Sequence, residues 1–212
     1  MKTRLPCAVR RRRIAPLAMS ALLLAGTLQA AMPTAITQSR RAGAVLTAEF
    51  GYDPQRRALR VDYRVRNDGA EPLAVFDRGD RHAVASGRQR AGAVAAPSWQ
   101  SLGAGDLQLS HVAEPLPRPA PVSPPTPLAL KLAPGAQAAG SFDFALPQAQ
   151  APQRLRWCLG VARFDPDQLD DPQRYGEVEV WRASFALAQT QQRLCTPWFD
   201  LGRGAFVADP AR

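Results

Sequence analysis

Strict alternation of apolar and charged side chains over eight positions, residues 59–66, most constrains how this chain can fold. From residue 58 to residue 67, ALRVDYRVRN places Leu59, Val61, Tyr63 and Val65 between charged residues. Successive side chains of an extended strand point to opposite faces, so a period of two makes one face apolar and the other charged. A sheet with one face in water is typical of antiparallel pairing.

Eight further segments carry strand signals, and turn residues separate them. They are 44–50, 73–76, 106–112, 128–132, 141–146, 154–164, 177–187 and 194–201. Turns are indicated by Asp53-Pro54 and by Asn67-Asp68-Gly69, because Pro presets a turn angle and Asn, Asp and Gly tolerate turn conformations. About nine strands with frequent turns predict an all-β sandwich.

Residues 114–127 hold seven of the chain's 20 prolines. Proline cannot donate a backbone hydrogen bond, so this segment should be extended, polyproline-like chain rather than a strand. At about 3.1 Å per residue its reach is roughly 40 Å. We expect it to cross from one sheet to the other, although its composition also fits an inter-domain linker.

The N-terminus has the pattern of a secretory signal peptide. Six cationic residues and no acidic ones lie in residues 2–13, an apolar run follows to Leu28, and small residues close it at Ala30-Ala31. The apolar core of about 15 residues is shorter than the roughly 20 that span a bilayer. Residues 1–30 are therefore expected to be a cleaved signal. An uncleaved membrane anchor is the alternative, because the uncharged stretch continues to Ser39.

Export changes how the charge and the cysteines are interpreted. The chain carries +9, of which six positive charges precede residue 30, so the mature chain carries about +3 and does not indicate nucleic-acid binding. Cys7 leaves with the signal, and the remaining pair, Cys158 and Cys195, predicts a disulfide. The loop-entropy model values this bridge at roughly 4 kcal/mol. Two separate buried thiols are the alternative.

Two stretches, LRVDYRVRNDGAEPLAVF and LALKLAPGAQAAGSFDFALP, resemble the immunoglobulin-like modules of secreted bacterial proteins. In those modules a strand that ends in Asn leads through an acidic-Pro turn to the next strand, and a Leu-x-Pro-Gly turn leads into a strand with aromatic residues. The resemblance implies an immunoglobulin-like antiparallel β-sandwich and says little about function.

The stretch FDRGDRHAV holds Asp77, Asp80 and His82 within six residues. A transition metal could use a His with carboxylates, but this spacing matches no recognised metal motif. The simpler interpretation is a solvated sheet rim, with Gly79 in a turn and the charges facing water. The three residues stay as metal candidates beside that interpretation.

The acidic segment 165–177 offers a second candidate site. Asp165, Asp167, Asp170, Asp171 and Glu177 could bind calcium, but the EF-hand spacing and its central Gly are missing. Asp165 followed by Pro166 instead predicts a short helix that joins two strands.

Other catalytic patterns are missing from the sequence. Ser110 and His111 are neighbours on an expected strand and would point to opposite faces. No G-x-S-x-G nucleophile elbow occurs. Trp157, Trp181 and Trp198 are expected to pack near the cysteines, whereas Trp99 in a loop is the aromatic residue expected to be exposed and to contact a ligand.

These observations predict an exported domain with no catalytic residues assigned. We expect a signal peptide (1–30), a flexible segment (31–42), one sandwich domain (43–202) with long loops and one short helix, and a tail (203–212). The expected function is a non-catalytic binding or accessory protein of the periplasm or envelope, without a cofactor, whose partner is another envelope protein or a peptide. The alternatives are a metal-dependent hydrolase that uses Asp77, Asp80 and His82, and a membrane-anchored structural envelope protein.

Overall fold

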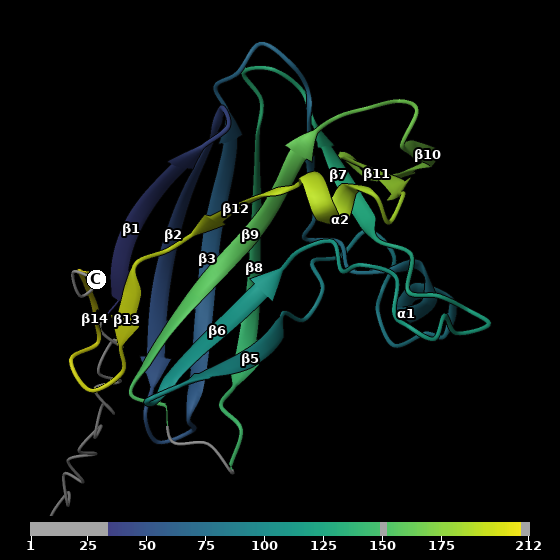
Figure 1. The fold of residues 1–212 in the computed structure, drawn as a ribbon. Coiled ribbons are helices and arrows are strands. Elements are labelled where there is room, and N and C mark those ends of the chain that lie inside the picture. The colour runs from purple at the N-terminus through teal and green to yellow at the C-terminus, as the bar shows by residue number, and fades with distance from the viewer. Residues whose placement is uncertain (1–33, 149–151, 209–212) are drawn as a thin grey trace, which may run out of the picture. The chain divides into compact units, whose positions relative to one another are not determined.

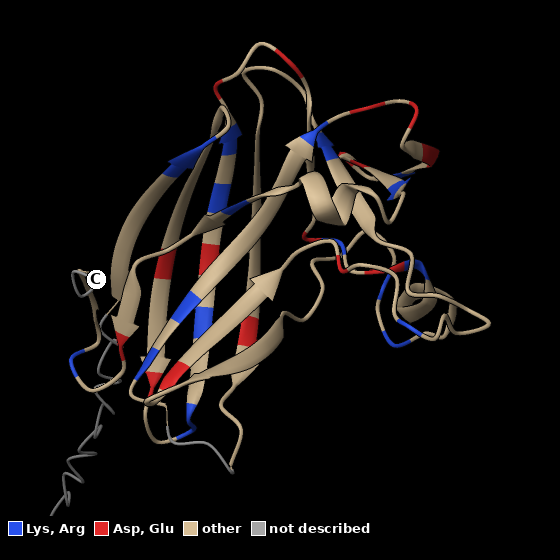
Figure 2. Ribbon diagram, in the orientation of Figure 1, with Lys and Arg blue, Asp and Glu red and all other residues tan. Residues whose placement is uncertain are grey.

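Strand β3 (Ala58–Asn67) covers the alternating segment and lies inside a four-stranded antiparallel sheet, sheet A, in the order β1-β2-β3-β8. The other strands of sheet A are β1 (Thr34–Arg41), β2 (Ala44–Asp53) and β8 (Gln137–Ala145). The apolar side chains of β3 are buried and its charged ones are exposed. Figure 2 shows the charged residues as bands along this strand. The structure, a computed structural model, describes residues 34–148 and 152–208.

The ten remaining strands form sheet B, which is strongly curled. They are β4 (Leu73–Val75), β5 (Ser98–Gly103), β6 (Asp106–His111), β7 (Leu128–Leu132), β9 (Arg154–Arg163), β10 (Leu169–Tyr175), β11 (Val178–Ala183), β12 (Gln192–Cys195), β13 (Trp198–Asp200) and β14 (Ala205–Val207). The described residues also form two short helices, α1 (Arg81–Ala85) and α2 (Leu187–Thr190). The all-β prediction is therefore confirmed.

Strand β9 is the centre of sheet B and has two partners in tandem along each edge (Figure 1). On one edge, β6 runs parallel to residues 154–159 and β4 pairs with residues 161–163. On the other edge, β13 and β12 follow one another. Beyond β4 lie β7, β11 and β10, whereas only β5 lies beyond β6.

Buried apolar residues form two clusters. The larger one fills the space between sheet A and sheet B and includes Phe50, Trp157 and Phe199. The smaller one contains Ala74, Phe76 and Leu187 and lies on the other side of β4. Both faces of β4 are therefore buried, which explains why its sequence, LAV, has no polar residue.

Small residues on one face of β9 let other segments close over it. A Cβ atom on Gly160 would lie 2.2 Å from Gln191 Oε1 and 3.1 Å from Val112 Cα. Gln191 in turn exchanges two hydrogen bonds with the backbone of Ala113. Cys158 lies on the same face of β9 and forms the predicted disulfide with Cys195 of β12, directly opposite in the ladder.

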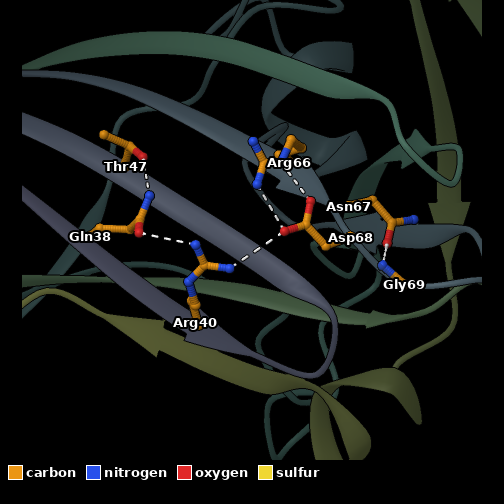
Figure 3. A network of polar contacts seen from close by, with 7 residues as sticks. All are labelled: Gln38, Arg40, Thr47, Arg66, Asn67, Asp68 and Gly69. Carbon is orange, nitrogen blue, oxygen red and sulfur yellow. Dashed lines mark hydrogen bonds and ion pairs between the residues drawn. The ribbon is translucent and has the colours of Figure 1, made fainter.

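Asn67 connects the two stretches that carry the immunoglobulin-like resemblance. Its side chain donates to Glu71 O and Leu132 O, and its Oδ1 accepts from Gly69 N in the predicted turn (Figure 3). Beside it, Asp68 forms ion pairs with Arg40 and Arg66. The fully buried Asn67 therefore holds the end of β3 against β7 of the other sheet.

Several predicted boundaries are wrong. The segment 31–42, expected to be flexible, contains β1, which pairs with β2 along its whole length. The expected tail 203–212 contains β14, which pairs with β13. The Pro-rich segment 114–127 does not cross between sheets, because β6 before it and β7 after it both belong to sheet B.

The short helix expected at Asp165 is also wrong. Asp165 Oδ1 accepts from Asp167 N, and Gln168 N donates to Asp165 O, which forms a turn directly before β10. The expected signal peptide, residues 1–30, lies outside the described residues. Within the described part of the chain, neither helix is long and apolar enough to cross a membrane.

Hydrogen bonds at the two ends of the β3–β8 pair show which residues of β8 face the open edge of sheet A. Asn67 N donates to Ala136 O, and Leu146 N donates to Arg57 O, in both cases between directly opposite residues. Bonded and non-bonded pairs alternate in an antiparallel ladder, so the even-numbered residues of β8 bond to β3. The odd-numbered residues, Gln137 to Ala145, direct their N–H and C=O groups to the edge, where no described strand pairs with them.

This assignment predicts opposite outcomes for proline at two neighbouring positions. Ala138→Pro removes a hydrogen bond to Val65 and should lower the free energy of unfolding by about 3 kcal/mol or more. Ala139→Pro removes an N–H that faces water and should cost about 1 kcal/mol or less. Urea denaturation of the two variants measures the difference, and equal losses would contradict the assignment.

Candidate functional site

The three metal candidates do not come together in the structure. Asp77 is fully buried, whereas Asp80 caps α1 by accepting a hydrogen bond from Ala83 N at 2.8 Å. His82 is partly exposed, and its Nδ1 lies 3.0 Å from Ser123 Oγ. Among the described residues, no group of three His, Cys, Asp or Glu side chains gathers as a metal site would require. The acidic segment 165–177 belongs to this described part, and its Asp170 pairs with Arg182 instead.

The expectation of a solvated sheet rim is wrong for the first two charges of this stretch. Asp77 is 0 % exposed and Arg78 is 4 % exposed. Asp77 Oδ2 accepts a hydrogen bond from Tyr63 OH at 2.6 Å, and Asp77 Oδ1 lies 3.0 Å from Arg78 Nε as an ion pair without hydrogen-bond geometry. The two residues that follow the end of β4 thus place a carboxylate and a guanidinium in the interior, where each compensates the charge of the other.

Arg78 and Asp77 also hold the irregular chain that follows α1. Arg78 Nη1 donates to Gly92 O, Arg78 O accepts from Gln89 Nε2, and Asp77 O accepts from Ala95 N. These backbone groups belong to a segment outside any strand or helix, so they need such partners when they are covered. The buried pair therefore fixes the path of residues 89–95 on the way to β5.

His111 forms the second half of this buried network. Its Nδ1 lies 3.0 Å from Trp157 Nε1, and its Nε2 lies 2.8 Å from Ala95 O. An indole N–H can only donate and a carbonyl can only accept, so Nδ1 is the acceptor and Nε2 carries the proton of a neutral imidazole. Burial lowers the pKa of His111 below its ordinary value, which favours this neutral form.

Tyr63 is held protonated by the same environment. Burial, followed by the neighbouring Asp77 carboxylate, raises the pKa of its phenol far above the ordinary value. A phenol that stays protonated donates to Asp77 at every physiological pH. Tyr63, Asp77, Arg78 and His111 are all buried, so they position the chain around them and are closed to a substrate.

In Figure 1 strand β5 runs diagonally across the front of β8, and its first residues pair with the end of β6 that carries His111. Ring contacts set the order of the strands, because Trp157 of β9 packs on Tyr63 of β3 and His111 of β6 packs on Phe142 of β8. β5 lies one strand further out than β6, and β8 is the last strand of sheet A. At the end of β6 that carries His111, the first residues of β5 therefore lie one strand further out than β8.

Trp99 on this strand is exposed, as predicted, but it lies in β5 rather than in a loop. It stands directly opposite Leu109, which belongs to the core between the sheets, so the indole is on the side of β5 that faces sheet A. Its exposed fraction is nevertheless 46 %. The other three tryptophans are more buried; Trp157 and Trp198 pack near the disulfide strands, and Trp181 packs in the smaller cluster.

The candidate site is therefore the open edge of β8 together with the exposed indole of Trp99. The sequence indicated Trp99 through its loop-like surroundings, but it did not indicate β8 as an edge or Tyr63 as the partner of Asp77. No family model matches the chain, and neither the curated proteins nor the solved structures compared with it include a match. Function is consequently inferred from the residues and their contacts.

Removal of the buried carboxylate tests the network. Asp77→Ala leaves the Arg78 guanidinium in the interior without its counter-charge and should lower the free energy of unfolding by about 3–5 kcal/mol. Asp80→Ala is the matched control, because it removes only the cap of a five-residue helix and should cost about 1 kcal/mol. Chemical denaturation of both variants measures this, and a loss as small for Asp77→Ala as for Asp80→Ala would contradict the burial of the pair.

Acid should weaken the fold through His111. Its pKa in the folded protein lies below the unfolded value of about 6.5, so unfolding takes up a proton at acidic pH. The stabilisation from neutral His111 is fully present above about pH 6.5 and is lost as the pH falls toward the folded pKa.

The variant His111→Asn can donate and accept a hydrogen bond but does not titrate. We expect the stability of the wild type relative to this variant to fall between pH 7.5 and pH 5, measured by urea denaturation at each pH. A difference that stays constant with pH would show that His111 is not the group that takes up the proton.

Proposed function

We propose that the protein is an exported, non-catalytic binding or accessory protein of the periplasm or envelope, and that it binds a segment of another protein at the candidate site. The observation that carries this proposal is the open edge of β8, nine residues long and paired with β3 without a break in register. Five residues of this edge direct unpaired backbone groups outward, and such a row is a template for an added strand.

The order of the strands supports the immunoglobulin-like part of the proposal. Strands β2, β3 and β8 are neighbours in sheet A, and β12, β9, β4 and β7 are neighbours in sheet B. A chain that passes repeatedly between two sheets in this order fits a Greek-key sandwich and so supports the proposed immunoglobulin-like fold. In this interpretation residues 76–127, which contain α1, β5 and β6, are a long insertion between β4 and β7.

The disulfide supports export. Cys158 and Cys195 lie on neighbouring strands, and disulfides persist mainly in oxidising compartments such as the periplasm. The hydrolase alternative lacks a comparable observation, because Asp77, Asp80 and His82 have separate partners.

Site-specific photo-crosslinking in the native host tests the proposal. A photoreactive side chain at Asp143, which lies on β8 and is exposed, should form an adduct with another protein. The adduct should disappear when Ala139→Pro removes an outward N–H from the same edge, while a photoreactive residue at Gln55, in the β2–β3 turn, should give no such adduct. An adduct that survives Ala139→Pro, or no adduct at all, would contradict binding at this edge.

A further inference from the structure

Arg64 is a charged group beside the open edge that has no ion-pair partner among the described residues. The other arginines on the outer face of β3 are paired, Arg60 with Asp62 and Asp143, and Arg66 with Asp68. Arg64 is exposed and stands directly opposite Ala139 of β8. Because Ala139 carries only a methyl group, a guanidinium from β3 can extend over it to a strand added at the edge.

A second charge lies four positions further along β8. Asp143 is 70 % exposed and its contact with Arg60 is 3.3 Å long. An added strand would therefore meet a positive group beside Ala139 and a negative group at Asp143. Opposite charges on neighbouring strands stabilise a sheet, and like charges directly opposite one another destabilise it.

The inner side of an added strand would meet Trp99. The indole is on the side of β5 that faces sheet A and is 46 % exposed. Residues of the added strand that face inward alternate with those that face the charges. Apolar residues at these alternate positions would cover the exposed part of the indole.

We propose that the occupant of the β8 edge is a single extended peptide segment that pairs antiparallel with β8, with apolar residues facing Trp99 and an acidic residue opposite Ala139 beside Arg64. This inference rests on the proposed function and names the chemistry of the partner. Antiparallel pairing continues the pattern of sheet A, in which every strand pair is antiparallel.

A second copy of the chain fits this edge less well. If two β8 strands paired, each copy would bring the start of its own β5 against that of the other, because the first residues of β5 lie further out than β8 in both. A single strand has no second sheet attached and can lie below β5. The occupant is therefore a peptide segment, and dimerisation is an outcome that the test must distinguish.

Two peptides of identical composition test this inference on the purified mature protein. Acetyl-Thr-Val-Arg-Val-Thr-Val-Glu-Val-Thr-amide places Arg opposite Asp143 and Glu opposite Ala139 when it pairs antiparallel in this register. The control peptide exchanges the Arg and the Glu. Fluorescence anisotropy of labelled peptides gives the affinities, and Trp99 fluorescence should change on binding.

We expect the first peptide to bind about tenfold more tightly than the exchanged one, because two favourable charge pairs become two unfavourable ones. Arg64→Glu should remove or reverse this preference. Ala139→Pro should abolish binding of both peptides, with its fold checked by circular dichroism. Equal binding of the two peptides, tighter binding of the exchanged one, or unchanged binding to Ala139→Pro would overturn the inference, as would dimerisation of the protein through β8.

Failure here is distinguishable from failure of the proposed function. If the photo-crosslinked adduct depends on Ala139 but neither peptide binds, the edge binds a protein of other chemistry and only the inferred peptide is wrong. If the adduct is also missing, the binding function itself is wrong.

Discussion

The buried ion pair of Asp77 and Arg78 is the interaction on which the long excursion between β4 and β7 depends. Some backbone groups of this excursion are covered by other residues but lie outside any strand. They therefore have no ladder of strand hydrogen bonds to satisfy them. The pair and its neighbours supply the missing partners, at Gly92 O and Ala95 N, while Tyr63 and His111 add bonds to Asp77 and to Ala95 O. A purely apolar core could not hold this path, because each covered carbonyl or N–H would lose its bond to water.

Burying these two charges costs free energy, and what the ion pair provides in return is a defined path for the chain that leads to β5. An ion pair in the interior contributes little net stability compared with apolar residues of the same volume, but removing one partner is costly. Such a pair therefore selects one arrangement of the chain rather than adding to its stability. Here the arrangement places β6 beside β9 and β5 beside β6, with Trp99 near the start of β5 exposed.

The local pattern of apolar and polar residues predicted the strands whose burial alternates or is continuous along the chain. It missed the elements whose position depends on contacts with residues far away in the sequence. Strands β3 and β7 have the predicted bounds because alternation or a short apolar run marks them. Strand β1 was missed because its inward residues include Thr37 and Ser39, and Ser39 contacts the carbonyl of Cys195 far along the chain. Asp77 was expected in water because its buried partners come from other elements and are invisible in the sequence around it.

An open edge such as that of β8 is a hazard as well as a binding surface. Natural sheets protect their edges with proline, bulges or lysine, because two exposed edges can pair and aggregate. The nine residues of β8 contain no proline or lysine, and their pairing with β3 has no bulge. Strand β5 of sheet B offers a different protection against pairing of two edges. It would obstruct the approach of a second sandwich to β8 but would leave room for a single strand. The same geometry that limits aggregation would thus select an extended peptide as the partner.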